Sequence, residues 1–172
     1  MSRTSSLAAA LVMFALAACG GAQPSGNVSD QDDVTAAKFV NLEDWASDNG
    51  LQGPYFDMRD ALTSGFNQIC GDTFCGSDYS NMQALSFRCS VEVKTGNIGQ
   101  CFWIFAGSYE DIAKTTGGVT VHQMFKKCAM PVKGSAKTLI TTLTAAGTTN
   151  AIRRVLPGST QTAYDALGGC LP

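Results

Sequence analysis

Residues 85–106 read LSFRCSVEVKTGNIGQCFWIFA, and their pattern points to the architecture of the whole chain. Apolar Phe87, Cys89 and Val91 alternate with polar residues, which is typical of a strand with one buried face. Lys94-Thr95-Gly96 then predicts a three-residue hairpin turn with Gly96 in the left-handed conformation. The stretch is therefore predicted to be a β-hairpin.

The turn fixes an expected register in which the numbers of paired residues sum to 190. The predicted pairs are Leu85–Phe105, Phe87–Trp103, Cys89–Cys101, Val91–Gly99 and Val93–Asn97. Cys89 and Cys101 would then lie about 5.5 Å apart at Cα, a distance that suits a disulfide. This pair would be a hydrogen-bonded one, whose Cβ vectors are less favourable, so the alternative is that each cysteine bonds elsewhere.

Outward from the hairpin, residues 101–106 are apolar on both faces, which predicts a central strand covered on both sides, with Phe102 and Trp103 in the core. Residues 107–118 read as a connecting loop. Residues 119–128 alternate again and predict a third strand.

Helical patterns flank the strands. Pro54 opens a segment in which Met58, Leu62 and Phe66 form one apolar stripe. Residues 41–45 predict a short helical turn before it. Ser135 is placed to cap a further helix that ends at Gly147.

The C-terminal part offers less regular patterns. Residues 148–158 fit either a helical turn or an edge strand, and residues 159–167 predict a last short helix. The order of elements predicts an α+β fold: a small antiparallel sheet of three to four strands, packed with helices and stapled by disulfides.

The cysteine count supports the disulfides. The chain has seven cysteines: Cys19, Cys70, Cys75, Cys89, Cys101, Cys128 and Cys170. Six remain if Cys19 is modified, and they can close three bridges in 15 ways. A Cys70–Cys75 ring and a Cys128–Cys170 bridge are candidates. Scattered spacing and a single histidine disfavour zinc.

The N-terminus reads MSRTSSLAAALVMFALAAC, with Arg3 ahead of an uncharged run from Leu7 to Ala18. The run is shorter than the roughly 20 residues that a spanning helix needs and is typical of a secretory signal. Leu16-Ala17-Ala18-Cys19 resembles the lipobox of bacterial lipoproteins. The resemblance covers about the first 21 residues. An ordinary cleaved signal is the alternative.

That resemblance implies cleavage before Cys19 and attachment there of a diacylglyceryl group with palmitate-type chains. Gly20, where an aspartate would retain the protein in the inner membrane, implies sorting to the outer membrane, facing the periplasm or the exterior. We therefore expect residues 1–18 to be a signal peptide, residues 19–40 a flexible tether, and residues 41–172 one domain.

Candidate chemistry is sparse. His122, the one histidine, is expected on the outer face of a strand and is a candidate base. Asp57, Asp60, Asp72 and Asp78 are the acids that a hydrolase would use. Asp72, Asp78 and Asn81 are weak calcium candidates without the EF-hand spacing. No nucleotide-binding motif is present, and no cofactor is predicted.

The pI of about 5.2 and net charge of −2 disfavour nucleic acid as a partner. The sequence therefore favours a lipid-anchored envelope protein that acts as a non-catalytic binding or accessory module for an envelope protein or polymer. The alternatives are a small periplasmic hydrolase that uses His122 or the Asp57–Asp78 acids, and a protease inhibitor that presents the loop 71–76.

Overall fold

The structure is a computed structural model that describes residues 38–70 and 81–171. The predicted signal peptide, Cys19 and nearly all of the tether lie outside the described residues. So do Asp72, Asp78, Cys75 and the loop 71–76.

The sheet has four antiparallel strands in the order β1-β2-β3-β4. Their bounds are β1 Phe39–Asn41, β2 Gln83–Glu92, β3 Ile98–Ile112 and β4 Val119–Met130. The predicted α+β class is therefore confirmed. The sequence does not predict β1. The expected tether includes Phe39 and Val40, which instead pair with Glu92 and Val91.

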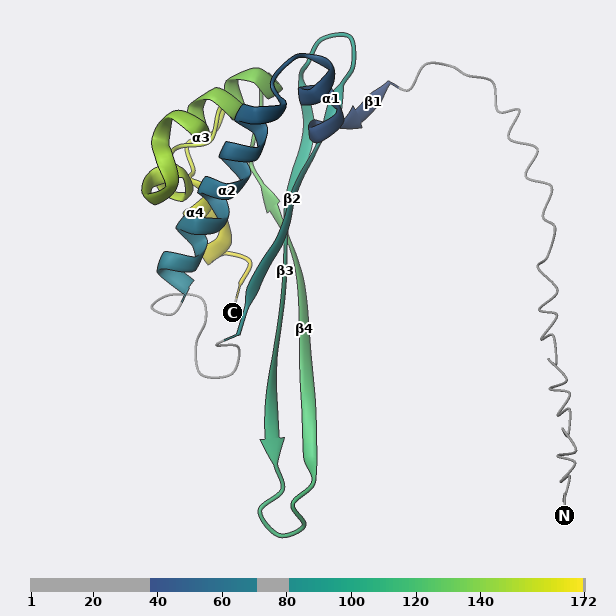
Figure 1. Ribbon diagram of the computed structural model, residues 1–172, viewed down its shortest axis with the longest axis vertical. Coiled ribbons are helices and arrows are strands. Elements are labelled where there is room, and N and C mark those ends of the chain that lie inside the picture. The colour runs from purple at the N-terminus through teal and green to yellow at the C-terminus, as the bar shows by residue number, and fades with distance from the viewer. Residues whose placement is uncertain (1–37, 71–80, 172) are drawn as a thin grey trace, which may run out of the picture. The chain divides into compact units, whose positions relative to one another are not determined.

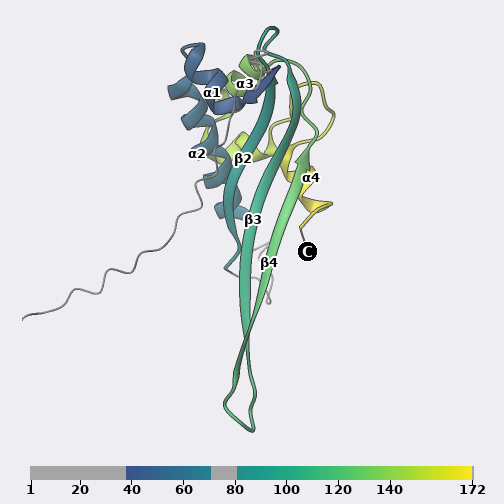
Figure 2. The same cartoon turned by 90° about the vertical axis from the view of Figure 1, so that its right-hand side faces the viewer.

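The helices cover one face of this sheet. They are α1 Leu42–Asp48, α2 Gln52–Ile69, α3 Ala136–Asn150 and α4 Ala163–Gly168, with a 3₁₀ turn, η2, at Ala151–Arg153. Figure 1 shows α2 and α3 together on one side of the strands, and Figure 2 shows the same arrangement from the side. β3 is central as predicted. Among the described residues only one of its faces is covered: Trp103 is buried as predicted, whereas Phe102, also predicted in the core, is only half-buried on the other face.

An aromatic cluster joins the helices to the sheet. Phe66 of α2 lies 4.8 Å from Phe105 and 5.9 Å from Trp103, between ring centroids. Phe87 of β2 meets the same Trp103 edge-on at 6.1 Å. All four side chains are buried. Because aromatic side chains bury the largest areas, this cluster is the centre of the core.

The hairpin register agrees with the prediction at its middle and departs at both ends. Phe87 pairs with Trp103 and Cys89 with Cys101, but Val91 pairs with Ile98. A bulge beside Ser90 causes that shift, and another beside Leu85 makes Ala84 the partner of Phe105. Each bulge adds an unpaired residue, which a count from the turn alone cannot include.

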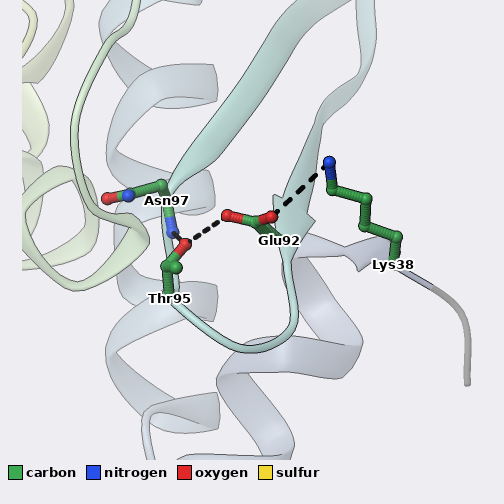
Figure 3. Close-up of polar contacts among 4 residues, drawn as sticks. All are labelled: Lys38, Glu92, Thr95 and Asn97. Atoms are coloured by element: carbon green, nitrogen blue, oxygen red, sulfur yellow. Dashed lines mark hydrogen bonds and ion pairs between the residues drawn. The ribbon is translucent and has the colours of Figure 1, made fainter.

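The turn after β2 is longer than the predicted three residues. Val93 belongs to it, and Gly96 takes the predicted positive φ of 68°. Figure 3 shows how the turn is held: Thr95 Oγ1 donates to Glu92 Oε2 at 2.7 Å, and Asn97 N–H donates to Thr95 Oγ1 at 3.2 Å. Lys38 Nζ lies 3.7 Å from Glu92 Oε1, so one glutamate contacts both the turn and the residue before β1.

The loop predicted over residues 107–118 is wrong in its first half. Residues 107–112 continue β3 and pair with β4 up to Ile112–Val119. The tight turn beyond them is closed by hydrogen bonds from Ala113 N–H to Gly118 C=O and from Gly117 N–H to Ala113 C=O, both 2.8 Å. The polar residues Ser108, Glu110 and Asp111 suggested a loop, because strand signals assume a buried face that this segment does not have.

Helix ends follow local chemistry. Ser135 Oγ accepts from Thr138 N–H, as predicted, and Gly147 interrupts α3 with φ 71° and ψ 175°. The last helix begins at Ala163 rather than at residue 159, because Thr162 and Asp165 form a capping box there.

Two disulfides are present among the described residues. Cys89–Cys101 joins β2 to β3 with Cα atoms 4.1 Å apart, and Cys128–Cys170 joins β4 to the C-terminal segment at 5.6 Å. The first distance is shorter than the 5.5 Å expected and is near that of a non-hydrogen-bonded pair. Cys70 is also in a disulfide.

Candidate functional site

The uncovered face of the sheet carries most of the exposed apolar side chains. On this face lie Phe102, Ile104 and Ala106 of β3, which are half-buried, and Phe125 of β4, which is 68% exposed. Lys127 Nζ lies 3.8 Å from the Phe102 ring centroid. No described element covers this face, and an exposed apolar sheet face is typical of a surface that binds another molecule.

A groove of about 640 Å³ lies on this face, where β2 begins. Its apolar members include Leu85, Ala106 and Phe125, one from each of the three long strands. Its polar members include the amides of Asn81, Gln83 and Gln123 and the hydroxyl of Ser108. The described residues that line it are Asn81, Gln83, Leu85, Ala106, Gly107, Ser108, Gln123, Met124 and Phe125.

The bulge in β2 supplies one wall of the groove. Ala84 pairs with Phe105 and Ser86 with Ile104, so Leu85 has no partner on β3. Its side chain is 55% exposed. Bulges often redirect a side chain in this way. The predicted pairing of Leu85 with Phe105 would instead have buried it.

A pair of hydrogen bonds fixes the polar side of the groove. Asn81 Nδ2 donates to Ser108 Oγ at 2.8 Å, and Ser108 N–H donates to Asn81 Oδ1 at 2.7 Å. Asn81, just before the first residue of β2, thus satisfies the backbone N–H of Ser108 at the edge of β3. The amide oxygen of Asn81, a candidate calcium ligand in the sequence, accepts a hydrogen bond from this backbone N–H.

None of the lining residues that the structure describes titrates near neutral pH. These residues can bury an apolar group and exchange hydrogen bonds through their amides. Amides donate and accept, which suits a peptide backbone or the hydroxyls of a sugar.

β3 and β4 continue past the helices as a two-stranded arm, residues 107–124 (Figures 1 and 2). Ile112, Val119 and Val121 are exposed on the face of the arm that continues the uncovered face of the sheet. Isolated two-stranded ribbons are marginal in water. An arm with this exposed apolar row is expected to be more stable when another strand pairs with it.

His122 lies on this arm, in a place that differs from the prediction. It shares the face of Trp103 and Cys128, not the outer face, but sits beyond the helices with 40% of its side chain exposed. Its Nε2 is 2.9 Å from Asp111 Oδ2, and its ring stacks on Tyr109 at 4.4 Å. None of the three lines the groove.

Of the candidate acids, only Asp57 and Asp60 lie among the described residues, and they do not form a site there. Asp57 and Asp60 are exposed on α2. Within residues 38–70 and 81–171, no group of three or more His, Cys, Asp or Glu is arranged to hold a metal ion.

A partly exposed polar cluster joins α1, α2 and β2. Tyr55 OH lies 3.5 Å from Glu43 Oε2, and Arg88 Nη1 lies 3.1 Å from the same oxygen. Burial raises the pKa of the Tyr55 hydroxyl, and the nearby Glu43 adds to the rise, while Arg59 opposes it. This cluster connects an acid of the first half of the chain to a base of the second.

Comparisons with known proteins give no relative. No protein-family model matches the chain, no curated protein matches it, and no solved structure matches it. None of the helices in the described part of the chain has the length and apolar character needed to cross a bilayer.

The groove was missed by reading the sequence. Gln83, Leu85 and Gln123 carry no motif, and each looks like ordinary strand periphery. One signal was available. Residues 101–106 are apolar on both faces, and the described helices cover only one of them, so the other face was left as an apolar surface.

Proposed function

We propose that this chain is a lipid-anchored envelope protein whose domain binds, without catalysis, an extended segment of another envelope protein or polymer. The groove is the observation that carries the proposal. It combines exposed apolar side chains with amides that can donate and accept, and none of its described lining residues is titratable. Binding sites commonly join an apolar surface to a few such polar groups.

Two further observations support the compartment. Five described cysteines are in disulfides, and disulfides persist mainly outside the cytosol. The segment Leu16-Ala17-Ala18-Cys19 supports anchoring by acylation of Cys19. Several acyl chains hold a protein at a bilayer, since each buried CH₂ contributes roughly 0.8 kcal/mol. Gly20 supports the outer membrane as the destination.

The residues of the arm do not support the hydrolase alternative. Asp111 and Tyr109 surround His122, but the cluster lies outside the groove on an open hairpin. A base needs a substrate held within hydrogen-bond reach. The inhibitor alternative depends on residues 71–76, which lie outside the described residues.

Site-specific photo-crosslinking in intact cells tests the groove. A benzophenone amino acid at Leu85, exposed in the groove, should give a discrete heavier adduct in the envelope fraction. The matched control is Val155, an aliphatic residue of similar exposure (50% against 55%) that does not line the groove. Equal adducts from both positions, or none from Leu85, would contradict the proposal.

A further inference from the structure

We infer that the arm pairs with the arm of a second copy of this chain, through the edge of β4 that no described strand occupies. The inference does not depend on the lipid anchor or on the ligand of the groove. It rests on the edge, the composition and the charge distribution of residues 105–127.

β4 lies at the end of the sheet order and, among the described residues, pairs only with β3. Its residues 119–125 read VTVHQMF, with high strand propensity, no Pro and no Gly. Proteins usually protect such edges with charges, prolines or bulges. Those devices are absent from this segment, so its outer backbone groups form a template for another strand.

The segment also carries apolar side chains that are exposed to solvent. Val119 is 64% exposed, Val121 55% and Phe125 68%, all on one face. An antiparallel pair related by a twofold axis at Gln123 would place Val121 of each copy opposite Phe125 of the other. Both apolar rows would then merge into one surface across the axis.

Charge is arranged to favour the antiparallel orientation. Glu110 and Asp111 lie toward the tip of the arm, whereas Lys126 and Lys127 lie at its base. In the twofold pairing Lys126 lies opposite Thr120 of the second copy. Asp111 is the next residue in that row, because it pairs with Thr120 on β3. A parallel pairing would instead set like charges together.

Within one chain this attraction cannot operate. Lys126 pairs with Phe105, and Asp111 pairs with Thr120, which lies six residues before Lys126 on β4. At about 3.3 Å per residue the two lie roughly 20 Å apart. An effect of one on the other therefore reports a contact between copies.

A charge-exchange experiment tests the inference. Full chains carrying two different tags are co-expressed, extracted in mild detergent and purified through one tag. Wild-type copies should capture each other. Lys126→Glu paired with itself, and Asp111→Lys paired with itself, should each lower the captured copy about tenfold, because like charges face each other twice.

The mixed pair decides the outcome. Lys126→Glu copies should capture Asp111→Lys copies nearly as well as the wild type captures itself, since both contacts are then complementary. The Lys126→Glu homotypic pair sets the background from copies sharing a micelle. Absence of wild-type capture, or a mixed pair no better than the homotypic ones, would overturn the inference.

A second variant guards against misfolding of the charge variants. Val121→Lys should abolish capture, whereas Val155→Lys, at a similarly exposed position away from the edge, should leave it unchanged. Loss from both, or from neither, would also overturn the inference.

Discussion

Cys128 of the edge strand β4 is bonded to Cys170, 42 residues later, with Cα atoms 5.6 Å apart. The segment between them contains α3, η2 and α4. One bond therefore closes the C-terminal helices onto the sheet, while Cys89–Cys101 closes only the 12-residue hairpin separation.

The two bridges should differ in what they contribute to stability. A longer closed loop removes more entropy from the unfolded chain. Replacing Cys128 and Cys170 by Ala should cost about 4 kcal/mol, and replacing Cys89 and Cys101 should cost about 3 kcal/mol. Urea unfolding of each double variant measures this. The reverse order, or unchanged midpoints, would contradict the assignment.

Gly96 should tolerate alanine less well than Gly50. Both have φ of 68°, but a Cβ at Gly96 would lie 2.8 Å from Trp45 Cζ2, while nothing lies within 4 Å at Gly50. Both variants suffer the left-handed strain of about 1–2 kcal/mol. The additional cost of Gly96→Ala, about 1–3 kcal/mol for overpacking, isolates the Trp45 contact. Equal unfolding free energies would show that Trp45 does not pack there.

These glycines show what the sequence could supply. Turn chemistry identified Gly96, and alternation identified the Phe87–Trp103 and Cys89–Cys101 pairs, because those signals are local. The sequence predicts neither β1 nor the two bulges, because these features depend on which strand lies alongside. The groove is not predicted for the same reason, because Leu85 and Gln123 come together only when β2, β3 and β4 are assembled.

The helix cap at Thr162 should depend on acid. Hydrogen bonds from the Thr162 backbone and hydroxyl lower the pKa of Asp165 below its usual range. A carboxyl whose pKa is lowered on folding stabilises the fold above its unfolded pKa, and this is lost as pH falls through the folded value. The stability gap between wild type and Thr162→Ala should therefore shrink on acidification below about pH 4.

Titration by NMR checks the cause directly. The Asp165 carboxyl in Thr162→Ala should titrate at higher pH than in the wild type. An unchanged midpoint would mean that the capping box does not hold the carboxylate.

The anchor should depend on one sulfur. Cys19→Ala removes the acyl acceptor, so the chain should leave the membrane fraction or accumulate unprocessed. Cys70→Ala serves as a control that removes a cysteine without touching the lipobox. Fractionation with immunoblotting separates the outcomes, and a processed Cys19→Ala protein that stays in the membrane would show that something else anchors it.

Mass spectrometry of the membrane-extracted protein, alkylated before and after reduction, tests the central claim most directly. We expect a mature chain that begins at Cys19 bearing thioether-linked lipid, with no alkylation of the other six cysteines until reductant is added. A mature terminus elsewhere, an alkylatable Cys19, or a cysteine labelled without reductant would contradict it.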